Sequence, residues 1–216
     1  HPHPVCGGYF WYDGYRRLIG KIRDGHLQEG RILTSEENSE CYIDLFDMLL
    51  VVNTPHNAEN CTIRPVFPRV YSDRVITSGF TYTPLSTDLM TNGDFRYEMT
   101  KALLWGSQPG WVDPRYLMSK EAEREARFLK TLMDFRRGLH DVGGRLRREL
   151  TPAGDNPTMH APGFGDDAAV LASEWQAPDG RRVYLVINRD DKAHKVSLPG
   201  AGTFRINGLS GKRIDL

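Results

Sequence analysis

The chain has 216 residues, of which 39% are hydrophobic and 26% charged, and this is the composition of an ordinary globular protein. Lys plus Arg and Asp plus Glu both number 28, so the formal net charge is zero, which argues against a nucleic-acid partner or an anionic membrane surface. No apolar run reaches the roughly 18 residues that a membrane span needs. The three cysteines are too few and odd in number for a disulfide framework.

The first two thirds of the chain alternate between helical and extended patterns. Residues 15–22 place Leu18, Ile19 and Ile22 on one side of a helix that ends near Gly25. Ser119 is a good N-cap for a later helix. In chain order the sequence predicts a helix at 15–22, a strand at 31–34, a short helix running into a strand at 42–52, a helix at 94–105, a strand at 107–111 and a helix from 119 to about 140.

The pattern changes at Gly143 and Gly144. Beyond them short segments rich in Val, Ile, Leu and Phe are separated by Gly and Pro turns, such as Pro178-Asp179-Gly180, which is typical of antiparallel strands. Strands are expected at 169–175, 182–188, 195–198 and 203–207. We therefore divide the chain into residues 1–143 and residues 144–216.

Alternation of strands and helices favours a parallel sheet or barrel, and a whole eight-stranded barrel needs about 250 residues. Residues 9–143 can supply about three or four β/α units. The predicted fold is thus α/β, the C-terminal portion of a (β/α)8 TIM barrel followed by a small all-β antiparallel sandwich. An open barrel would expose strand edges, so we expect preceding sequence or a partner to complete it, with self-association as one outcome. The chain begins at His1, and its compartment is left open.

The densest polar run is Thr34 to Glu40. In a barrel, catalytic groups lie at the C-terminal ends of strands, and Glu36 follows the predicted strand 31–34. A carboxylic acid there could protonate a glycosidic oxygen. A glycosidase needs a second carboxyl, and the nearest in sequence are Glu40, Asp44 and Asp47. The alternative is that the acids of this run decorate a loop and a helix N-terminus.

Aromatic and histidine side chains are the candidates for contact with a sugar. His1 and His3 with Cys6 could ligate zinc, but no second ligand cluster follows, so we predict no metal and no cofactor. The two histidines could instead form hydrogen bonds with substrate hydroxyls, or have no role at a frayed chain end. Large aromatics serve packing more often than binding. The candidate substrate-binding residues are His1, His3, Trp11, Asn38, Trp105 and Trp111.

Several short blocks resemble a family of bacterial glycoside-hydrolase-like TIM-barrel proteins, largely catalogued as a domain of unknown function, with a C-terminal β-sandwich. The blocks are His3-Pro4 with Gly7-Gly8, Trp11 and Gly14-Tyr15-Arg16; Leu33-Thr34-Ser35-Glu36 with Asn38, Glu40, Tyr42, Asp44 and Phe46-Asp47; Pro65, Phe67, Val70-Tyr71 and Asp73-Arg74; Trp105-Gly106 with Gly110-Trp111; and Ser173, Trp175 and Gly180 with residues 185–188. The chain departs from the family pattern at Ser35 and Glu37.

The resemblance implies hydrolysis of O-glycosidic bonds of a carbohydrate, with Glu36 and Glu40 at the positions of the family's strand-end glutamates. It also implies a further acidic residue on a strand before the His-Pro loop, which this sequence lacks. The chain would then carry the acid/base without the nucleophile. Two other functions stay open: a non-catalytic carbohydrate-binding or structural module on a degenerate barrel, and a metal site at His1, His3 and Cys6.

Overall fold

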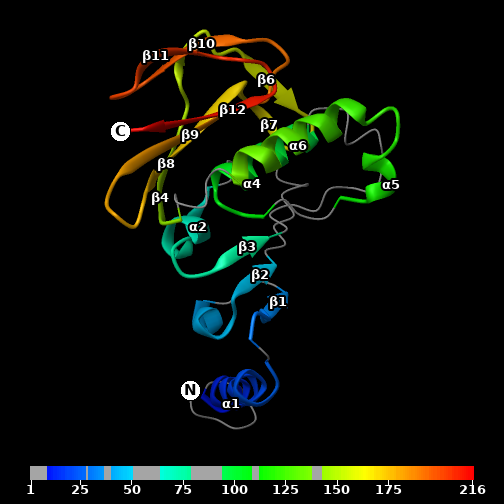
Figure 1. Cartoon of the computed structure of the whole chain (residues 1–216), viewed down its shortest axis with the longest axis vertical. Coiled ribbons are helices and arrows are strands. Elements are labelled where there is room, and N and C mark those ends of the chain that lie inside the picture. The colour runs from blue at the N-terminus through cyan, green and yellow to red at the C-terminus, as the bar shows by residue number, and fades with distance from the viewer. Residues whose placement is uncertain are drawn as a thin grey trace.

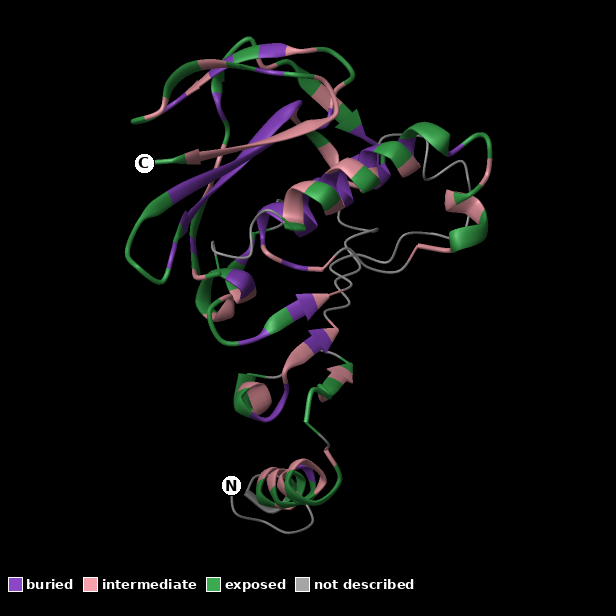
Figure 2. Ribbon diagram, in the orientation of Figure 1, coloured by how far each residue is buried: buried purple, intermediate pink, exposed green. Residues whose placement is uncertain are grey.

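A computed structural model describes residues 9–27, 29–36, 40–50, 64–78, 94–108, 112–137 and 143–216. Figure 1 shows the N-terminal helix at one end of the long axis, a small parallel sheet next to it, and antiparallel sheets with two helices at the other end. Buried residues gather in the antiparallel part and are sparse on the N-terminal helix (Figure 2). The main core is therefore C-terminal.

The N-terminal region is built on α1 (Tyr9–His26) and three short parallel strands. Two basic residues, Arg23 and His26, lie in the last turn of α1, where positive charge favours the helix dipole. The strands β1 (Thr34–Glu36), β2 (Met48–Leu50) and β3 (Ile76–Ser78) are hydrogen-bonded in that order, with the 3₁₀ helix η1 (Glu40–Leu45) between β1 and β2 and α2 (Val66–Tyr71) before β3. Their small core contains Ile19, Leu45, Phe46, Leu49 and Val75.

Two long helices cover one face of the antiparallel part. All residues of α4 (Asp94–Leu104) are buried, whereas α6 (Glu123–Arg137) buries one face through Phe128 and Leu132. The helices contact each other, and both contact the sheet. The short α5 (Pro114–Leu117) begins with Asp113, whose carboxylate accepts a hydrogen bond from the Arg115 backbone N–H.

The antiparallel strands form three sheets. A four-stranded sheet has the order β12 (Ser210–Asp215), β9 (Arg182–Asn188), β8 (Val170–Gln176), β4 (Arg145–Leu150). A second sheet has the order β11 (Gly202–Ile206), β10 (His194–Leu198), β5 (Ala153–Gly154), and β6 (Thr158–Ala161) pairs with β7 (Gly165–Ala168). Strands β8, β9, β10 and β11 lie within one residue of the four predicted segments, whereas the sequence does not predict β4, β5, β6, β7 and β12.

Both faces of the four-stranded sheet are covered. Successive side chains of a strand point to opposite faces, so one strand can contribute to two hydrophobic clusters. Leu171, Trp175 and Leu185 lie in one hydrophobic cluster with α4 and α6. Val170 and Tyr184 lie in another cluster with residues of β10 and β11. The C-terminal core therefore has three layers: helices, the four-stranded sheet and the second sheet.

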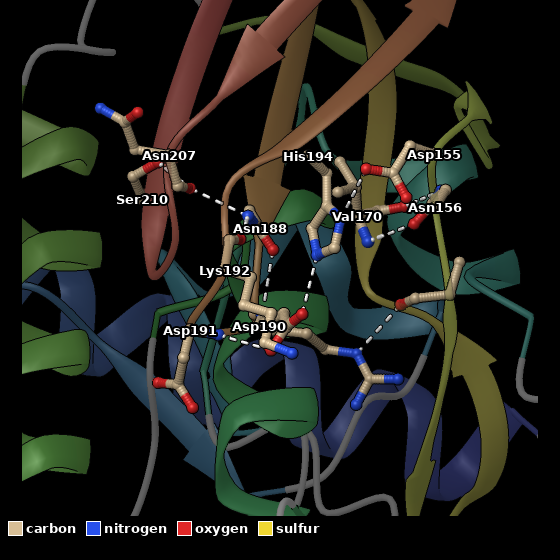
Figure 3. A network of polar contacts seen from close by, with 12 residues as sticks. Asp155, Asn156, Val170, Asn188, Asp190, Asp191, Lys192, His194, Asn207 and Ser210 are labelled. Carbon is tan, nitrogen blue, oxygen red and sulfur yellow. Dashed lines mark hydrogen bonds and ion pairs between the residues drawn. The ribbon is translucent and has the colours of Figure 1, made fainter.

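A polar network fixes the connections at the end of β9 (Figure 3). The Asn188 side-chain amide donates to the backbone carbonyls of Lys192 (2.7 Å) and Asn207 (2.9 Å). His194 lies between two carboxylates, with Nε2 2.7 Å from Asp190 and Nδ1 3.5 Å from Asp155. These contacts join strand ends to loops, so we assign the network to the fold.

The prediction that residues 1–143 form part of a TIM barrel is wrong. The parallel sheet holds three strands of three residues each, and most of the strands in the described part of the chain are antiparallel. The predicted 107–111 strand is reduced, within the described residues, to a single parallel bridge between Ser78 and Gln108. The physical reason is the packing of α4 and α6, which cover the antiparallel sheet where a barrel would have them cover parallel strands. The protein is a β-rich domain with a few helices, and the self-association expected of an open barrel loses its basis.

Candidate functional site

A hollow of about 270 Å³ lies between α1 and the parallel sheet. Its walls come from α1, β1, η1 and β2, together with Phe46, which lies between η1 and β2. Four elements that follow one another in the chain therefore meet there. Ligands of parallel sheets bind beyond the carboxyl ends of the strands, and β1 ends at Glu36 inside this hollow. The lining residues are Trp11, Tyr15, Ser35, Glu36, Tyr42, Phe46 and Leu49.

Aromatic rings make up most of the wall. Trp11 and Tyr15 are four residues apart on α1 and so share a face of that helix. The rings of Tyr15 and Tyr42 have centroids 4.8 Å apart, and Tyr15 also contacts Phe46 at 6.3 Å. Trp11 remains 64% exposed, so its ring is a surface platform, while the rings below it are fixed by mutual packing.

Glu36 is the one carboxylate among the described residues that line this hollow. It is the last residue of β1, whose backbone pairs with β2 through Glu36 and Leu50. Glu36 is exposed, and no hydrogen bond or ion pair from another described residue holds its side-chain oxygens. An acid in this position can exchange a proton with a ligand in the hollow.

The other predicted carboxylates lie elsewhere. Asp47 accepts hydrogen bonds from Arg23 (3.1 and 3.2 Å) and from the Leu33 backbone N–H (2.8 Å). The hydrogen bonds from Arg23, and then from Leu33, lower the pKa of Asp47. Asp44 is paired with Arg16 in the same manner. Glu40 begins η1, is exposed and does not line the hollow.

Trp105, predicted to bind substrate, is 1% exposed and lies in the main core. Its indole Nε1 donates to Glu149 Oε1 over 2.6 Å, and the ring lies 5.7 Å from Lys101 Nζ. Its burial is explained by packing. His1, His3, Asn38 and Trp111 lie outside the described residues.

The structure thus brings Glu36 and Trp11 together and leaves Glu40, Asp47 and Trp105 apart from them. Sequence reasoning missed Tyr15 and Tyr42 as lining residues. The signal for Tyr15 is its spacing of four from Trp11, which places both on one face because α1 begins at Tyr9, before the predicted helix start at residue 15. Within the described ranges, no group of three or more His, Cys, Asp or Glu side chains could hold a metal ion. None of the described helices is long and apolar enough to cross a membrane.

Comparisons with known proteins bear on this site. A family model described as Domain of unknown function (DUF6259) matches residues 1–82, a range that includes both Trp11 and Glu36. Over 216 residues the chain is 46% identical to a Bacteroides thetaiotaomicron protein named "Putative glycoside hydrolase". That match covers 99% of this chain and 32% of the relative, so the chain spans about a third of the relative's length. No solved structure matches the chain. The relative supports the resemblance to glycoside-hydrolase-like proteins and leaves the barrel unsupported.

Proposed function

We propose that the chain is part of a glycoside hydrolase that cleaves an O-glycosidic bond of a carbohydrate, with Glu36 as general acid/base and no cofactor. The observation that carries the proposal is the shared hollow of Glu36 with Trp11, Tyr15 and Tyr42. Aromatic faces pack against the apolar faces of sugar rings, and a carboxylic acid beside them can reach the glycosidic oxygen. The name of the 46% identical relative agrees with this chemistry.

In the proposed reaction the Glu36 carboxyl gives its proton to the glycosidic oxygen as the bond to the anomeric carbon breaks. If a second carboxylate attacks the anomeric carbon, the Glu36 carboxylate then takes a proton from the water that opens the covalent intermediate. If the second carboxylate instead activates a water for direct attack, that carboxylate takes the proton of the water. The exposed position of Glu36 gives its oxygens access to both oxygen atoms in turn. The predicted substrate contacts of His1, His3, Asn38 and Trp111 remain part of the proposal.

The reaction needs a second carboxylate, about 5 to 9.5 Å from the first. Asp47 is already held by Arg23 and Leu33, so it is poorly suited to attack or to activate water. Glu40 has an exposed side chain and is the better of the two predicted residues. A carboxylate from the rest of the protein is the other source, as the resemblance implies.

A carbohydrate-binding module without catalysis is the second candidate function. It is favoured by the 64% exposure of Trp11 and by the lack of a second carboxylate among the described lining residues. Substitution of Trp11 by Ala would weaken sugar binding under either function, so it does not separate them. Turnover separates them.

The test is hydrolysis by the whole protein carrying Glu36→Gln, which keeps the size of the side chain and removes its acid. We expect turnover to fall by about 10²–10⁴-fold, the range that acid–base catalysis contributes. Glu29→Gln is the matched control, because Glu29 is exposed and does not line the hollow. Unchanged hydrolysis in Glu36→Gln would remove Glu36 from the mechanism. Glycan binding by a wild-type protein that hydrolyses none of the glycans it binds would favour the binding module.

A further inference from the structure

A second hollow, of about 400 Å³, is lined by four arginines and a single acid. Arg69 comes from α2, Arg147 and Arg148 from β4, and Arg182 from β9. The acid is Glu174 of β8. This local excess of positive charge stands out in a chain whose formal net charge is zero.

Strand register brings these side chains together. Glu174 of β8 is directly opposite Arg148 of β4 and opposite Tyr184 of β9, which places Arg182 on the diagonal. The register between β4 and β8 shifts between Leu146 and Arg148, so Arg147 is an extra residue in a β-bulge. Glu174 and Arg182 share the sheet face on which Val170 and Tyr184 meet the second sheet, so the hollow extends that face beyond the apolar core.

Glu174 fixes two of the arginines. It is 5% exposed, and its carboxylate accepts a hydrogen bond from Arg182 Nε at Oε1 (2.6 Å) and from Arg148 Nε at Oε2 (2.7 Å). Burial opposes ionisation of Glu174, but the hydrogen bonds from Arg182 and Arg148 outweigh burial and lower its pKa. The carboxylate therefore stays charged and positions both guanidinium groups.

Both contacts with Glu174 use only Nε, so Glu174 leaves the Nη1 and Nη2 atoms of each guanidinium for another acceptor. The Arg148 and Arg182 side chains are about half exposed, at 50% and 53%. Arg69 and Arg147 are exposed as well, and neither side chain has an ion pair within the described part of the chain. Four guanidinium groups and one carboxylate line the hollow, so positive charge exceeds negative charge there and attracts an anion.

We propose that the hollow lined by Arg69, Arg147, Arg148 and Arg182 binds an anionic group of a carbohydrate, either the carboxylate of a uronic acid or a sulfate ester. Planar guanidinium groups match both anions, because they donate two parallel hydrogen bonds to a pair of oxygens. Gln176, which also lines the hollow, adds an amide for a neutral hydroxyl. The identity of the ligand as a carbohydrate rests on the proposed function, whereas the preference for an anion rests on the arginines alone.

Binding to the chain is tested by titration calorimetry with two matched pairs of probes: oligogalacturonate against its methyl ester, and dextran sulfate against dextran. We expect one of the charged probes to bind and both neutral partners to bind at least about tenfold more weakly. The double variant Arg69→Gln/Arg147→Gln should weaken binding of the charged probe by about tenfold or more and leave the fold intact, because neither side chain supports Glu174.

Arg181→Gln is the matched control. Arg181 is the neighbour of Arg182 and is 45% exposed, but it pairs with Asp179 and does not line the hollow. Its affinity for the charged probe should equal that of the wild type. Equal binding of charged and neutral probes, or no effect of Arg69→Gln/Arg147→Gln relative to Arg181→Gln, would overturn the proposal. Binding of a single-stranded DNA oligonucleotide more tightly than either charged glycan would also overturn it, since the ligand would then be a nucleic acid.

The outcome is separable from that of the proposed function. Binding in this hollow is measured without turnover. A protein that binds oligogalacturonate through these arginines and hydrolyses nothing would contradict the catalytic role of Glu36 and leave the anion site supported. Conversely, loss of hydrolysis in Glu36→Gln together with equal binding of charged and neutral probes would contradict the anion site and leave the catalytic role of Glu36 supported.

Discussion

Asp47 joins three segments at the start of β2. Its carboxylate accepts hydrogen bonds from Arg23 of α1 and from the backbone of Leu33, just before β1. The Asp47 backbone N–H donates in return to the Leu33 carbonyl over 2.9 Å. Asp47, which the sequence predicts as a possible second catalytic carboxylate, thus has a structural role instead: it holds α1 and the segment before β1 together.

Asp47→Asn should lower the free energy of unfolding at pH 7 by about 1 kcal/mol, a modest figure because the ion pair is one third exposed. The folded state holds the pKa of Asp47 below its ordinary value, so the stabilisation is complete above the unfolded pKa of about 3.9. It is lost as pH falls through the lower folded pKa. The variant should therefore differ from the wild type at neutral pH and converge with it in acid.

Urea unfolding at a series of pH values measures this difference. Asp44→Asn is the comparison, because the Asp44 carboxylate also pairs with an arginine but is 59% exposed. Its effect should be the smaller of the two. A larger loss in Asp44→Asn, or a loss in Asp47→Asn that grows as the pH falls, would contradict the role given to Asp47.

Helix α4 depends on a glycine just beyond its end. Gly106 has φ +78°, and its N–H donates to the Leu103 carbonyl over 3.0 Å, as expected for a helix-terminating residue. A Cβ added there would lie 2.6 Å from Cη2 of Trp175, a buried residue of β8. The glycine thus ends the helix and admits the indole that joins it to the sheet.

Gly106→Ala should destabilise the protein by about 2–4 kcal/mol, because it adds the strain of a positive φ to an overpacked contact. Gly20→Ala in α1 is the control, since a Cβ at Gly20 meets nothing within 4 Å. It should stabilise by about 0.5–1 kcal/mol, because alanine favours a helix interior. Thermal unfolding of both variants checks the prediction, which fails if their shifts have the same sign.

At the scale of the whole molecule, the sequence predicts the strands better than their assembly. Short apolar runs between Gly and Pro turns located β8 and β9, since such a run is a local property of the sequence. The sequence also predicted a helix for α4, but not its complete burial. Charged residues such as Arg96 and Lys101 indicate a solvent-facing surface, whereas here Arg96 pairs with Glu125 and Lys101 with Glu149. Those partners lie 29 and 48 residues away, beyond the reach of any local pattern.

The candidate site shows the same limit. A strand-end position was enough to single out Glu36, and Trp11 was one of several large aromatics that could offer a stacking face. Their meeting in one hollow depends on how α1 packs on η1, which brings Tyr42 against Tyr15. Trp105 and Asp47 were misleading because an indole N–H or a carboxylate is equally able to satisfy a buried or half-buried partner.

The division into residues 1–143 and 144–216 remains a prediction. The packing of α4 and α6 against the four-stranded sheet suggests that a cut at residue 143 would expose the apolar face formed by Leu171, Trp175 and Leu185. An independently folding C-terminal unit would therefore have to include α4 and α6, so its N-terminal boundary would lie before Asp94.

The most direct test of the central claim, that Glu36 is the proton donor of a glycosidase, is the dependence of hydrolysis on the leaving group. Oligosaccharides need a proton on the departing oxygen, whereas dinitrophenyl glycosides need it much less. In Glu36→Gln we expect kcat/KM to fall by about 10²–10⁴-fold for oligosaccharides and to be nearly preserved for dinitrophenyl glycosides. An equal loss for both substrates, or no loss for either, would contradict it.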